Sequence, residues 1–166
     1  MTEQQTKFLA LIDGPAKESE RRWDIPAPIT IAQAILESGW GQSQLFLQAN
    51  NPFGMKTLQH RRDGEPYCEF DTRECVNGEW EVIRAQFLRF GSLTDAFNKH
   101  GSMFWSERYG PVIDACKTIS TPYTLEQLRT IALAIQHCGY STDPNYSDKI
   151  LQLIQQIQAA PEPQNT

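Results

Sequence analysis

The sequence has no long apolar run and no long run of a single charge. The apolar stretch nearest its N-terminus is only five residues long, Phe8 to Ile12, which is too short for a secretory signal or a membrane span. Acidic residues outnumber lysine and arginine by 20 to 15, and the formal net charge is −5. Such a chain does not attract nucleic acid or anionic lipid through its charge. We expect a protein made in the cytoplasm without an export signal, with no membrane span and no nucleic-acid partner.

Cysteine and histidine are few and scattered. The four cysteines form no C-x-x-C pair, and histidines occur only at positions 60, 100 and 137. Zinc sites gather such ligands at close spacing, so we expect no metal and no cofactor. On one extended strand Cys68 and Cys75 would lie about 20 Å apart, too far to bridge without a turn between them. Cys116 and Cys138 flank a predicted helix, and a disulfide between them stays open as an alternative to two free thiols.

Length and composition fit a single enzyme-sized domain. The chain has 166 residues, of which 40% are hydrophobic, with four tryptophans and eight phenylalanines. That is enough apolar material for one core. Residues 159–166 include two prolines and no large apolar side chain. We therefore expect one domain over residues 1–158 and a loose C-terminal tail at 159–166.

A predicted helix over residues 31–38 carries the first candidate catalytic residue. Its buried positions recur at i, i+3, i+4 and i+7, namely Ile31, Ala34, Ile35 and Ser38. Gly39 follows directly and supplies the left-handed conformation that ends a helix. Glu37 thus lies on the last turn, between Leu36 and Trp40, where desolvation and the helix dipole both favour the protonated carboxyl. A carboxyl kept protonated in this way is suited to act as a general acid.

Other patterns predict further helices. The apolar residues 8–12 belong to a first helix that Asp13-Gly14-Pro15 should interrupt, with a second helix over 16–23. Thr30 or a neighbour should cap the helix that carries Glu37. Later helices are expected to begin at Ser92, near Val112, at the capping box Thr124–Gln127, and at Asp143-Pro144 with proline in the first position.

Two stretches that favour strands predict a β-hairpin. They cover residues 68–76 and 79–84, and Asn77-Gly78 between them is the strongest two-residue hairpin turn. Such a turn pairs Val76 with Glu79, Cys75 with Trp80 and Glu74 with Glu81. Two opposed carboxylates cost stability, so the pair at 74 and 81 indicates either a functional carboxylate or a solvated edge. The fold class that follows is α+β, mostly helical, with a small β-hairpin lobe at about residues 57–90.

Three blocks of the sequence stand in a recognisable order. They are Ala32–Gly41, Asn50–Lys56 and Gly139–Tyr146, and with their flanks they extend over most of the chain. Together they resemble the signature blocks of glycoside hydrolase family 73, the lysozyme-like β-N-acetylglucosaminidases of bacterial autolysins and flagellar muramidase-like domains. The resemblance implies a lysozyme-like fold with a sugar-binding groove between a helical lobe and the hairpin. It also implies hydrolysis of the β-1,4-linked glycan of peptidoglycan after N-acetylglucosamine.

The same resemblance implies roles for two carboxylates. Glu37 would protonate the departing glycosidic oxygen. The second carboxylate of the family lies on a Thr-x-Glu-aromatic strand, which Thr72-Arg73-Glu74 matches except that Cys75 replaces the aromatic residue. Because of that departure, Asp71 and Glu69 remain competitors for the role of Glu74. The acetamido oxygen of the substrate is a further candidate for meeting the oxocarbenium-like centre.

Side chains of the three blocks are also expected to contact sugar. Tyr140 would lie opposite the general acid and hydrogen-bond the acetamido group or position a water molecule, whereas Tyr146 should pack. Phe53 and Asn51 would line the groove. Trp40 would either stack on sugar or fold back onto the helix that it follows.

Several alternatives accompany this hypothesis. The nearest enzymatic one is a muramidase, and others are a phage lysis or tail enzyme and a glycan-binding module that has lost catalysis. A substrate outside the cytoplasmic membrane, combined with no export signal, favours delivery by an apparatus such as type VI secretion, as an antibacterial toxin acting in the periplasm of a target cell. A periplasmic immunity protein would then insert into the groove near Glu37.

Overall fold

The computed structural model describes residues 1–57, 64–76 and 79–160, with the backbone alone at 73–76 and 79–80. Within these ranges the chain forms helices, one 3₁₀ turn and a two-stranded antiparallel sheet. In order, they are α1 Glu3–Trp23, α2 Ala27–Ser38, α3 Gln44–Ala49, β1 Tyr67–Val76, β2 Glu79–Leu88, α4 Leu93–Met103, η1 Glu107–Tyr109, α5 Gly110–Cys116, α6 Leu125–His137 and α7 Tyr146–Gln158. The expected mostly helical α+β fold with one small hairpin is confirmed.

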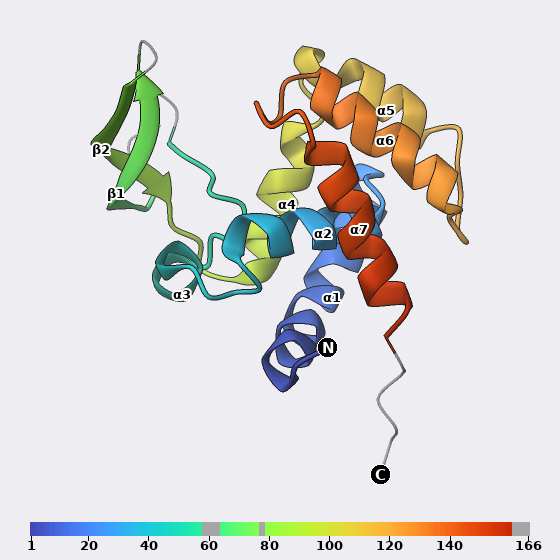
Figure 1. Ribbon diagram of the computed structural model, residues 1–166, viewed down its shortest axis with the longest axis horizontal. Helices are drawn as coiled ribbons and strands as arrows, with labels where there is room; N and C mark the ends of the chain where they lie inside the picture. Colours follow the sequence, from blue (N-terminus) through green and yellow to red (C-terminus); the bar gives the residue numbers. More distant parts are fainter. Residues whose placement is uncertain (58–63, 77–78, 161–166) are drawn as a thin grey trace.

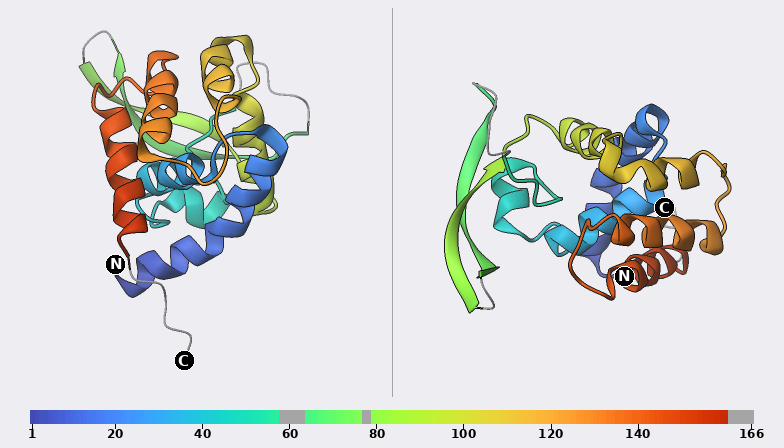
Figure 2. Two further views of the ribbon diagram at one scale, coloured as in Figure 1. Left: turned by 90° about the vertical axis from the view of Figure 1, so that its right-hand side faces the viewer. Right: turned by 90° about the horizontal axis from the view of Figure 1, so that it is seen from above.

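Helix α2 lies at the centre of the helical body, and the hairpin projects from one side of it (Figure 1). Packing contacts join α2 to α1, α6 and α7. Seen from above, the hairpin is a curved ribbon to one side of the helices, with α3 beside it (Figure 2, right). The molecule therefore has a helical lobe organised around α2 and a β-lobe beside it.

Helix α1 is continuous through Pro15, so the predicted interruption at residues 13–15 is wrong. A proline inside a helix removes one hydrogen bond and strains the preceding turn. Here the buried residues Phe8, Ile12, Ala16 and Ser19 form one stripe on both sides of Pro15. Packing of that stripe against the body of the protein outweighs the local cost, because helices in proteins are stabilised mainly by tertiary burial.

Helix α2 begins at Ala27 after Pro26, so the expected cap at Thr30 is also wrong. Thr30 lies inside the helix and is buried. Instead, a side chain from α1 serves the helix N-terminus: Glu20 accepts a hydrogen bond of 3.1 Å from the Ala27 N–H. A carboxylate at this position also complements the positive end of the helix dipole. The end of α2 agrees with the prediction, because Gly39 follows it with φ of 57°.

Two hydrophobic clusters meet at α2. Ile29 and Ala32 belong to the cluster shared with α5, α6 and α7. Ala34 and Ile35 belong to the cluster shared with α1, α3 and α4. Because α2 contributes to both, it is buried on almost all sides.

The hairpin has the register that the sequence predicts. Val76 pairs with Glu79, Cys75 with Trp80, and Glu74 with Glu81. The turn residues Asn77 and Gly78 lie outside the described residues. At the other end, Lys56 forms a bridge with Phe87, which joins the sheet to the loop that follows α3.

The later helices agree with their predicted caps in two cases and differ in one. Ser92 caps α4, and Thr124 with Gln127 forms the capping box of α6. Helix α7 begins at Tyr146 rather than at Asp143-Pro144. Asp143 instead accepts a hydrogen bond of 2.9 Å from the Asn145 N–H, which makes a turn before the helix.

Cys68, Cys116 and Cys138 carry free thiols, so no disulfide joins Cys116 to Cys138. The side chain of Cys75 and the tail at 161–166 lie outside the described residues. None of the helices in the described ranges is long and apolar enough to cross a membrane.

Replacing Gly41 with alanine should destabilise the protein. Gly41 has φ of +75°, and a Cβ there would lie 2.4 Å from a ring carbon of Phe8. We expect Gly41→Ala to lower the free energy of unfolding by about 2–4 kcal/mol, measured by urea denaturation. The matched control is Gly14→Ala in α1, where a Cβ would meet nothing within 4 Å beyond its chain neighbours. The gain in helix propensity is offset there by the clash between a Cβ and the ring of Pro15, so this change should alter stability by less than about 1 kcal/mol. Equal stability of Gly41→Ala and the wild type would contradict this packing.

Candidate active site

Glu37 lies on the last turn of α2, two positions before Gly39. Its side chain reaches the surface, but the protein atoms around the carboxyl desolvate it and raise its pKa above the ordinary value for glutamate. The negative end of the α2 dipole acts in the same direction. Such a carboxyl can hold a proton and give it to a leaving group.

Two phenols lie near the Glu37 carboxyl. Burial is the main cause that raises the pKa of Tyr140 and of Tyr146, and the negative charge of Glu37 raises both further. The two phenol rings are 5.5 Å apart between centroids. Both hydroxyls therefore stay protonated over the range in which a carboxyl titrates. The charge of Glu37 therefore acts on Tyr140, although the two residues come from the first and the third sequence blocks.

His100 in α4 contacts the hydroxyl of Tyr140. Its Nε2 lies 3.1 Å from Tyr140 Oη. The side chain is completely buried, and its ring stacks on Phe53 with centroids 3.9 Å apart. Burial lowers the pKa of His100 to about 3, so the ring is neutral. The structure thus places this neutral ring against a candidate site residue.

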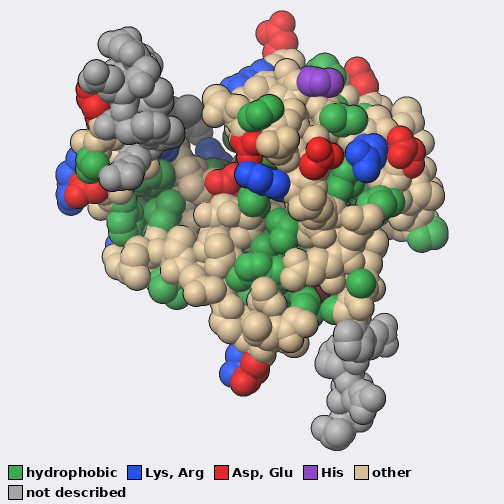
Figure 3. Space-filling model, viewed as in Figure 1, with side chains coloured by type: hydrophobic (Ala, Val, Ile, Leu, Met, Phe, Trp, Pro, Cys, Tyr) green, Lys and Arg blue, Asp and Glu red, His purple; other side chains and the backbone are tan. Residues whose placement is uncertain are grey.

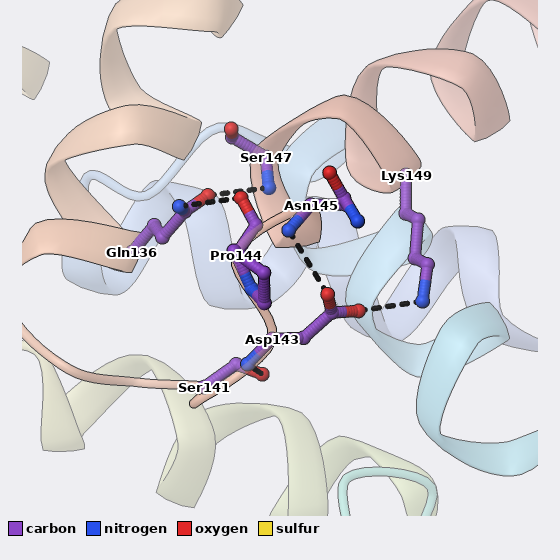
Figure 4. Close-up of polar contacts among 7 residues, drawn as sticks. All are labelled: Gln136, Ser141, Asp143, Pro144, Asn145, Ser147 and Lys149. Atoms are coloured by element: carbon purple, nitrogen blue, oxygen red, sulfur yellow. Dashed lines mark hydrogen bonds and ion pairs between the residues drawn. The ribbon is translucent and has the colours of Figure 1, made fainter.

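The loop between α6 and α7, which carries Tyr140, is fixed by hydrogen bonds from a side chain of α6. Figure 4 shows the contacts of this loop. Gln136 Nε2 donates to the Pro144 carbonyl at 2.9 Å, and Gln136 Oε1 accepts from the Ser147 N–H at 2.9 Å. One amide therefore ties the end of α6 to the start of α7. Sequence reasoning missed Gln136, because nothing local distinguishes it from other surface glutamines.

Charged side chains hold the same loop from two sides. Asp143 pairs with Lys149 and accepts a hydrogen bond from the Asn145 N–H (Figure 4). Arg108 donates to the carbonyl oxygens of residues 138–139. The backbone just before Tyr140 is thus held by a guanidinium from η1, which restricts where the phenol can lie.

Gln33 lies one turn before Glu37 in α2 and is completely buried. Its Nε2 donates to Tyr146 Oη at 2.8 Å, while its Oε1 has no hydrogen-bond partner among the described residues. Sequence reasoning missed this residue too. The available signal was a glutamine within an apolar helix, because a buried amide needs partners.

Phe53 is buried, which corrects the expectation that it lines the groove. Its side chain is 5% exposed. The ring packs edge-on against Phe97 with centroids 4.8 Å apart and stacks on His100. Phe53 therefore packs in the core, one layer behind Tyr140.

Asn51 is likewise buried, at 1% exposure, and its hydrogen bonds go to the protein backbone. Its Nδ2 donates to the carbonyls of Met55 and Leu88, each at 2.9 Å. Its Oδ1 accepts from the Met55 N–H at 3.0 Å. The expected groove contact is replaced by a structural role, in which Asn51 fastens the loop after α3 to the base of β2.

Trp40 lies just past α2, with a left-handed φ of 59°, and is half-buried. Its side chain packs against the cluster that contains Ile35, and its carbonyl accepts a hydrogen bond from Gln4. This position corresponds to the packing alternative. Contact between its exposed part and sugar stays a prediction.

The two faces of the hairpin separate the candidates for the second carboxylate. Along β1, residues 67, 69 and 71 are exposed while 68, 70 and 72 are half-buried. Glu69 and Asp71 are on the exposed face, where each pairs with Arg84 at 3.2 Å. By its register, position 74 continues the series 68, 70 and 72 on the opposite face. The side chain of Glu74 lies outside the described residues, so its role stays a prediction.

The surface is hollowed between the hairpin and the helical body (Figure 3). This is where the expected groove should lie. In the part of the chain that the structure describes, no three His, Cys, Asp or Glu side chains are placed to hold a metal ion.

Known proteins resemble the chain along nearly its whole length. The Glucosaminidase family model, described as mannosyl-glycoprotein endo-beta-N-acetylglucosaminidase, matches residues 14–159. The peptidoglycan hydrolase FlgJ of Salmonella typhimurium (strain LT2) is 34% identical over 160 residues, which cover 93% of this chain and 47% of FlgJ. The exo-glucosaminidase LytG of Bacillus subtilis (strain 168) is 31% identical over 159 residues, covering 92% and 51%. The chain thus spans about half the length of these relatives.

A solved structure gives the same result for the fold. The C-terminally truncated glycoside hydrolase domain from Salmonella typhimurium FlgJ has a TM-score of 0.71 and 33% identity, and the match covers 95% of this chain and 99% of that domain. The lysozyme-like fold expected from the sequence is therefore confirmed.

Substitutions at Asn51 and Phe53 should lower stability, because both side chains are buried and neither is exposed enough to contact substrate directly. Phe53→Leu removes the stacking partner of His100, and Asn51→Ala leaves the Leu88 carbonyl and the Met55 N–H without their partner. Each should cost about 1–3 kcal/mol in urea unfolding. The control is Leu47→Ala at a 60% exposed position of α3, which should change stability by less than about 0.5 kcal/mol. If Phe53→Leu raised KM without a change in stability, Phe53 would be assigned to the substrate-binding groove and not to the core.

Proposed function

The chain belongs to the Glucosaminidase family, and from this premise we propose that it hydrolyses the β-1,4-linked glycan of peptidoglycan, cutting after N-acetylglucosamine. Relatives named peptidoglycan hydrolase and exo-glucosaminidase align with more than nine-tenths of the chain, which supports the substrate class. The observation in this chain that carries the proposal is Glu37, a carboxyl whose pKa is raised by desolvation beside two neutral phenols.

Glu37 acts as the general acid. Its proton passes to the glycosidic oxygen while the bond from that oxygen to the anomeric carbon breaks, so the leaving sugar departs as a neutral alcohol. Positive charge then develops at the anomeric carbon and ring oxygen of the other sugar.

Glu74 is the proposed second carboxylate. Its support is the register, which pairs position 74 with Glu81 and, by the alternation of a strand, separates it from Glu69 and Asp71, which pair with Arg84. Glu74 would activate water as a base or act as a nucleophile, according to its distance from Glu37. The acetamido oxygen of the substrate is the alternative group for stabilising the anomeric carbon.

Tyr140 is proposed to bind the acetamido group or a water molecule. Its support is that the phenol is neutral, fixed by His100 and close to Glu37. Substrate binding through such a preoriented hydroxyl costs little entropy.

Digestion of purified sacculi tests the proposal. Glu37→Gln should reduce release of soluble fragments by about 10²-fold or more, because the amide cannot donate the required proton. The matched control is Glu18→Gln at an exposed position of α1, which should retain full activity. Mass spectrometry of the reduced fragments identifies the sugar at the reducing end, which should be N-acetylglucosamine.

The same assay distinguishes the alternatives. N-acetylmuramic acid at the reducing end would indicate a muramidase, and inactivity of the wild type on intact sacculi would favour a glycan-binding module. Because the acid must be protonated, the rate should fall as pH rises through the pKa of Glu37, and desolvation should place that decline above the ordinary value of 4.5. Glu37→Gln with wild-type activity would remove Glu37 from its role.

Delivery as an antibacterial effector with a periplasmic immunity protein stays a prediction from the sequence. Expression with an added periplasmic signal should lyse cells in a Glu37-dependent way, whereas cytoplasmic expression should not. Lysis in neither compartment, or a neighbouring gene for a holin or tail component instead of an exported inhibitor, would contradict the effector hypothesis.

A further inference from the structure

His100 and Tyr140 share one hydrogen bond whose direction is set by the position of a single proton. Nε2 of His100 lies 3.1 Å from Tyr140 Oη. Either the phenol donates to Nε2, or Nε2–H donates to the phenol oxygen. The direction determines whether the Tyr140 hydroxyl still has its own hydrogen to offer on its other side.

The surroundings of His100 restrict its protonation. The ring is completely buried among aromatic side chains: Phe53 stacks on it at 3.9 Å between centroids, Phe104 meets it edge-on at 5.2 Å, and Tyr140 lies at 5.9 Å. Burial keeps the ring neutral, because it lowers the pKa of His100 to about 3. Only one of the two ring nitrogens therefore carries a hydrogen.

The surroundings of Nδ1 decide which of the two ring nitrogens carries the hydrogen. Nδ1 is buried and has no hydrogen-bond partner among the described residues. A hydrogen on Nδ1 would make it an orphan donor, which costs about 1–3 kcal/mol. Buried N–H groups without an acceptor are rarer in proteins than under-satisfied acceptors. The hydrogen therefore belongs on Nε2, where Tyr140 Oη accepts it.

We propose that His100 is a positioning residue that donates from Nε2 to Tyr140 and thereby directs the phenol O–H away from α4, as a donor toward the Glu37 side of the site. The charged and titratable groups that face this phenol are Tyr146, Glu37 and Tyr109. A donor beside the general acid suits a carbonyl oxygen of the substrate, such as that of an acetamido group. This last step rests on the proposed function, whereas the direction of the His100–Tyr140 bond does not.

The inference also gives Phe53 a consequence for the site. Stacking with ring planes 10° apart fixes the plane of the imidazole, and with it the direction of the Nε2–H bond. A buried aromatic residue of the second sequence block thus acts on Tyr140 through His100.

Nitrogen NMR of the ¹⁵N-labelled full chain measures the tautomer directly. Long-range ¹H–¹⁵N correlation should give His100 a pyrrole-like Nε2 and a pyridine-like Nδ1, unchanged between pH 5 and 8. The signals are assigned by their loss in His100→Gln, with those of the other two histidines retained. A pyridine-like Nε2, or an imidazolium pattern within this pH range, would overturn the proposal.

Activity on sacculi tests the positioning role. His100→Gln keeps an N–H donor and should retain activity within about threefold, whereas His100→Met removes the donor and should lower kcat by tenfold or more. The control for core disruption is Phe97→Leu, a completely buried residue that contacts Phe53 but not the hydrogen bond. At a temperature where all three are folded by circular dichroism, Phe97→Leu should keep its kcat. Equal losses in His100→Met and Phe97→Leu would mean that His100 only fills the core.

A double substitution tests whether His100 acts through Tyr140 or independently of it. In a Tyr140→Phe background the acceptor is absent, so His100→Met should lower kcat by less than about twofold further. A second tenfold loss would show that His100 acts independently of Tyr140. If the wild type releases no fragments from sacculi the proposed function fails, yet the NMR measurement still decides the direction of the His100–Tyr140 bond.

Discussion

Burial of helix α2 is the constraint on which the whole site depends. The helix packs against α1, α6 and α7 and contributes to both hydrophobic clusters, so its position cannot change without repacking the core. Its N-terminus is held by Glu20 from α1, and its C-terminus ends at Gly39 with a left-handed φ. Glu37, on the last turn, is the point at which this fixed helix reaches the surface. The carboxyl therefore inherits its location and its raised pKa from packing rather than from a charged partner.

A polar layer inside the protein supports that carboxyl at a cost in stability. Gln33 hydrogen-bonds Tyr146, His100 hydrogen-bonds Tyr140, and both phenols feel the charge of Glu37. In each pair one buried atom, Gln33 Oε1 or His100 Nδ1, has no hydrogen-bond partner among the described residues. Apolar side chains of the same shape would avoid the free-energy cost of such an unpaired polar atom. Incompletely satisfied polar groups of this kind gather at sites where orientation matters more than stability. The arrangement is consistent with two hydroxyls whose directions are fixed before substrate arrives.

Sequence patterns predicted correctly those features that neighbouring residues determine. The Asn77-Gly78 turn predicted the hairpin register, Gly39 predicted the end of α2, and the Thr124–Gln127 box predicted the start of α6. Errors occurred where distant parts of the chain decide. Pro15 lies within α1 because a buried stripe continues through it, and Phe53 lies in the core because α4 brings His100 against it. The three sequence blocks pointed to the segments that surround the candidate site. They did not distinguish side chains that could contact substrate from buried side chains that only support them.

The second sequence block, Asn50–Lys56, contains side chains that support the candidate site from within the core. Asn51 binds the backbone at the base of β2, and so positions the strand pair that carries Glu74. Phe53, two residues later, stacks on His100, which binds Tyr140. One short loop therefore contacts both the hairpin that carries Glu74 and the imidazole that binds Tyr140. Neither Asn51 nor Phe53 is exposed enough to bind a glycan itself. The loop therefore supports the site from behind, because Asn51 holds the base of the hairpin and Phe53 holds the imidazole that binds Tyr140.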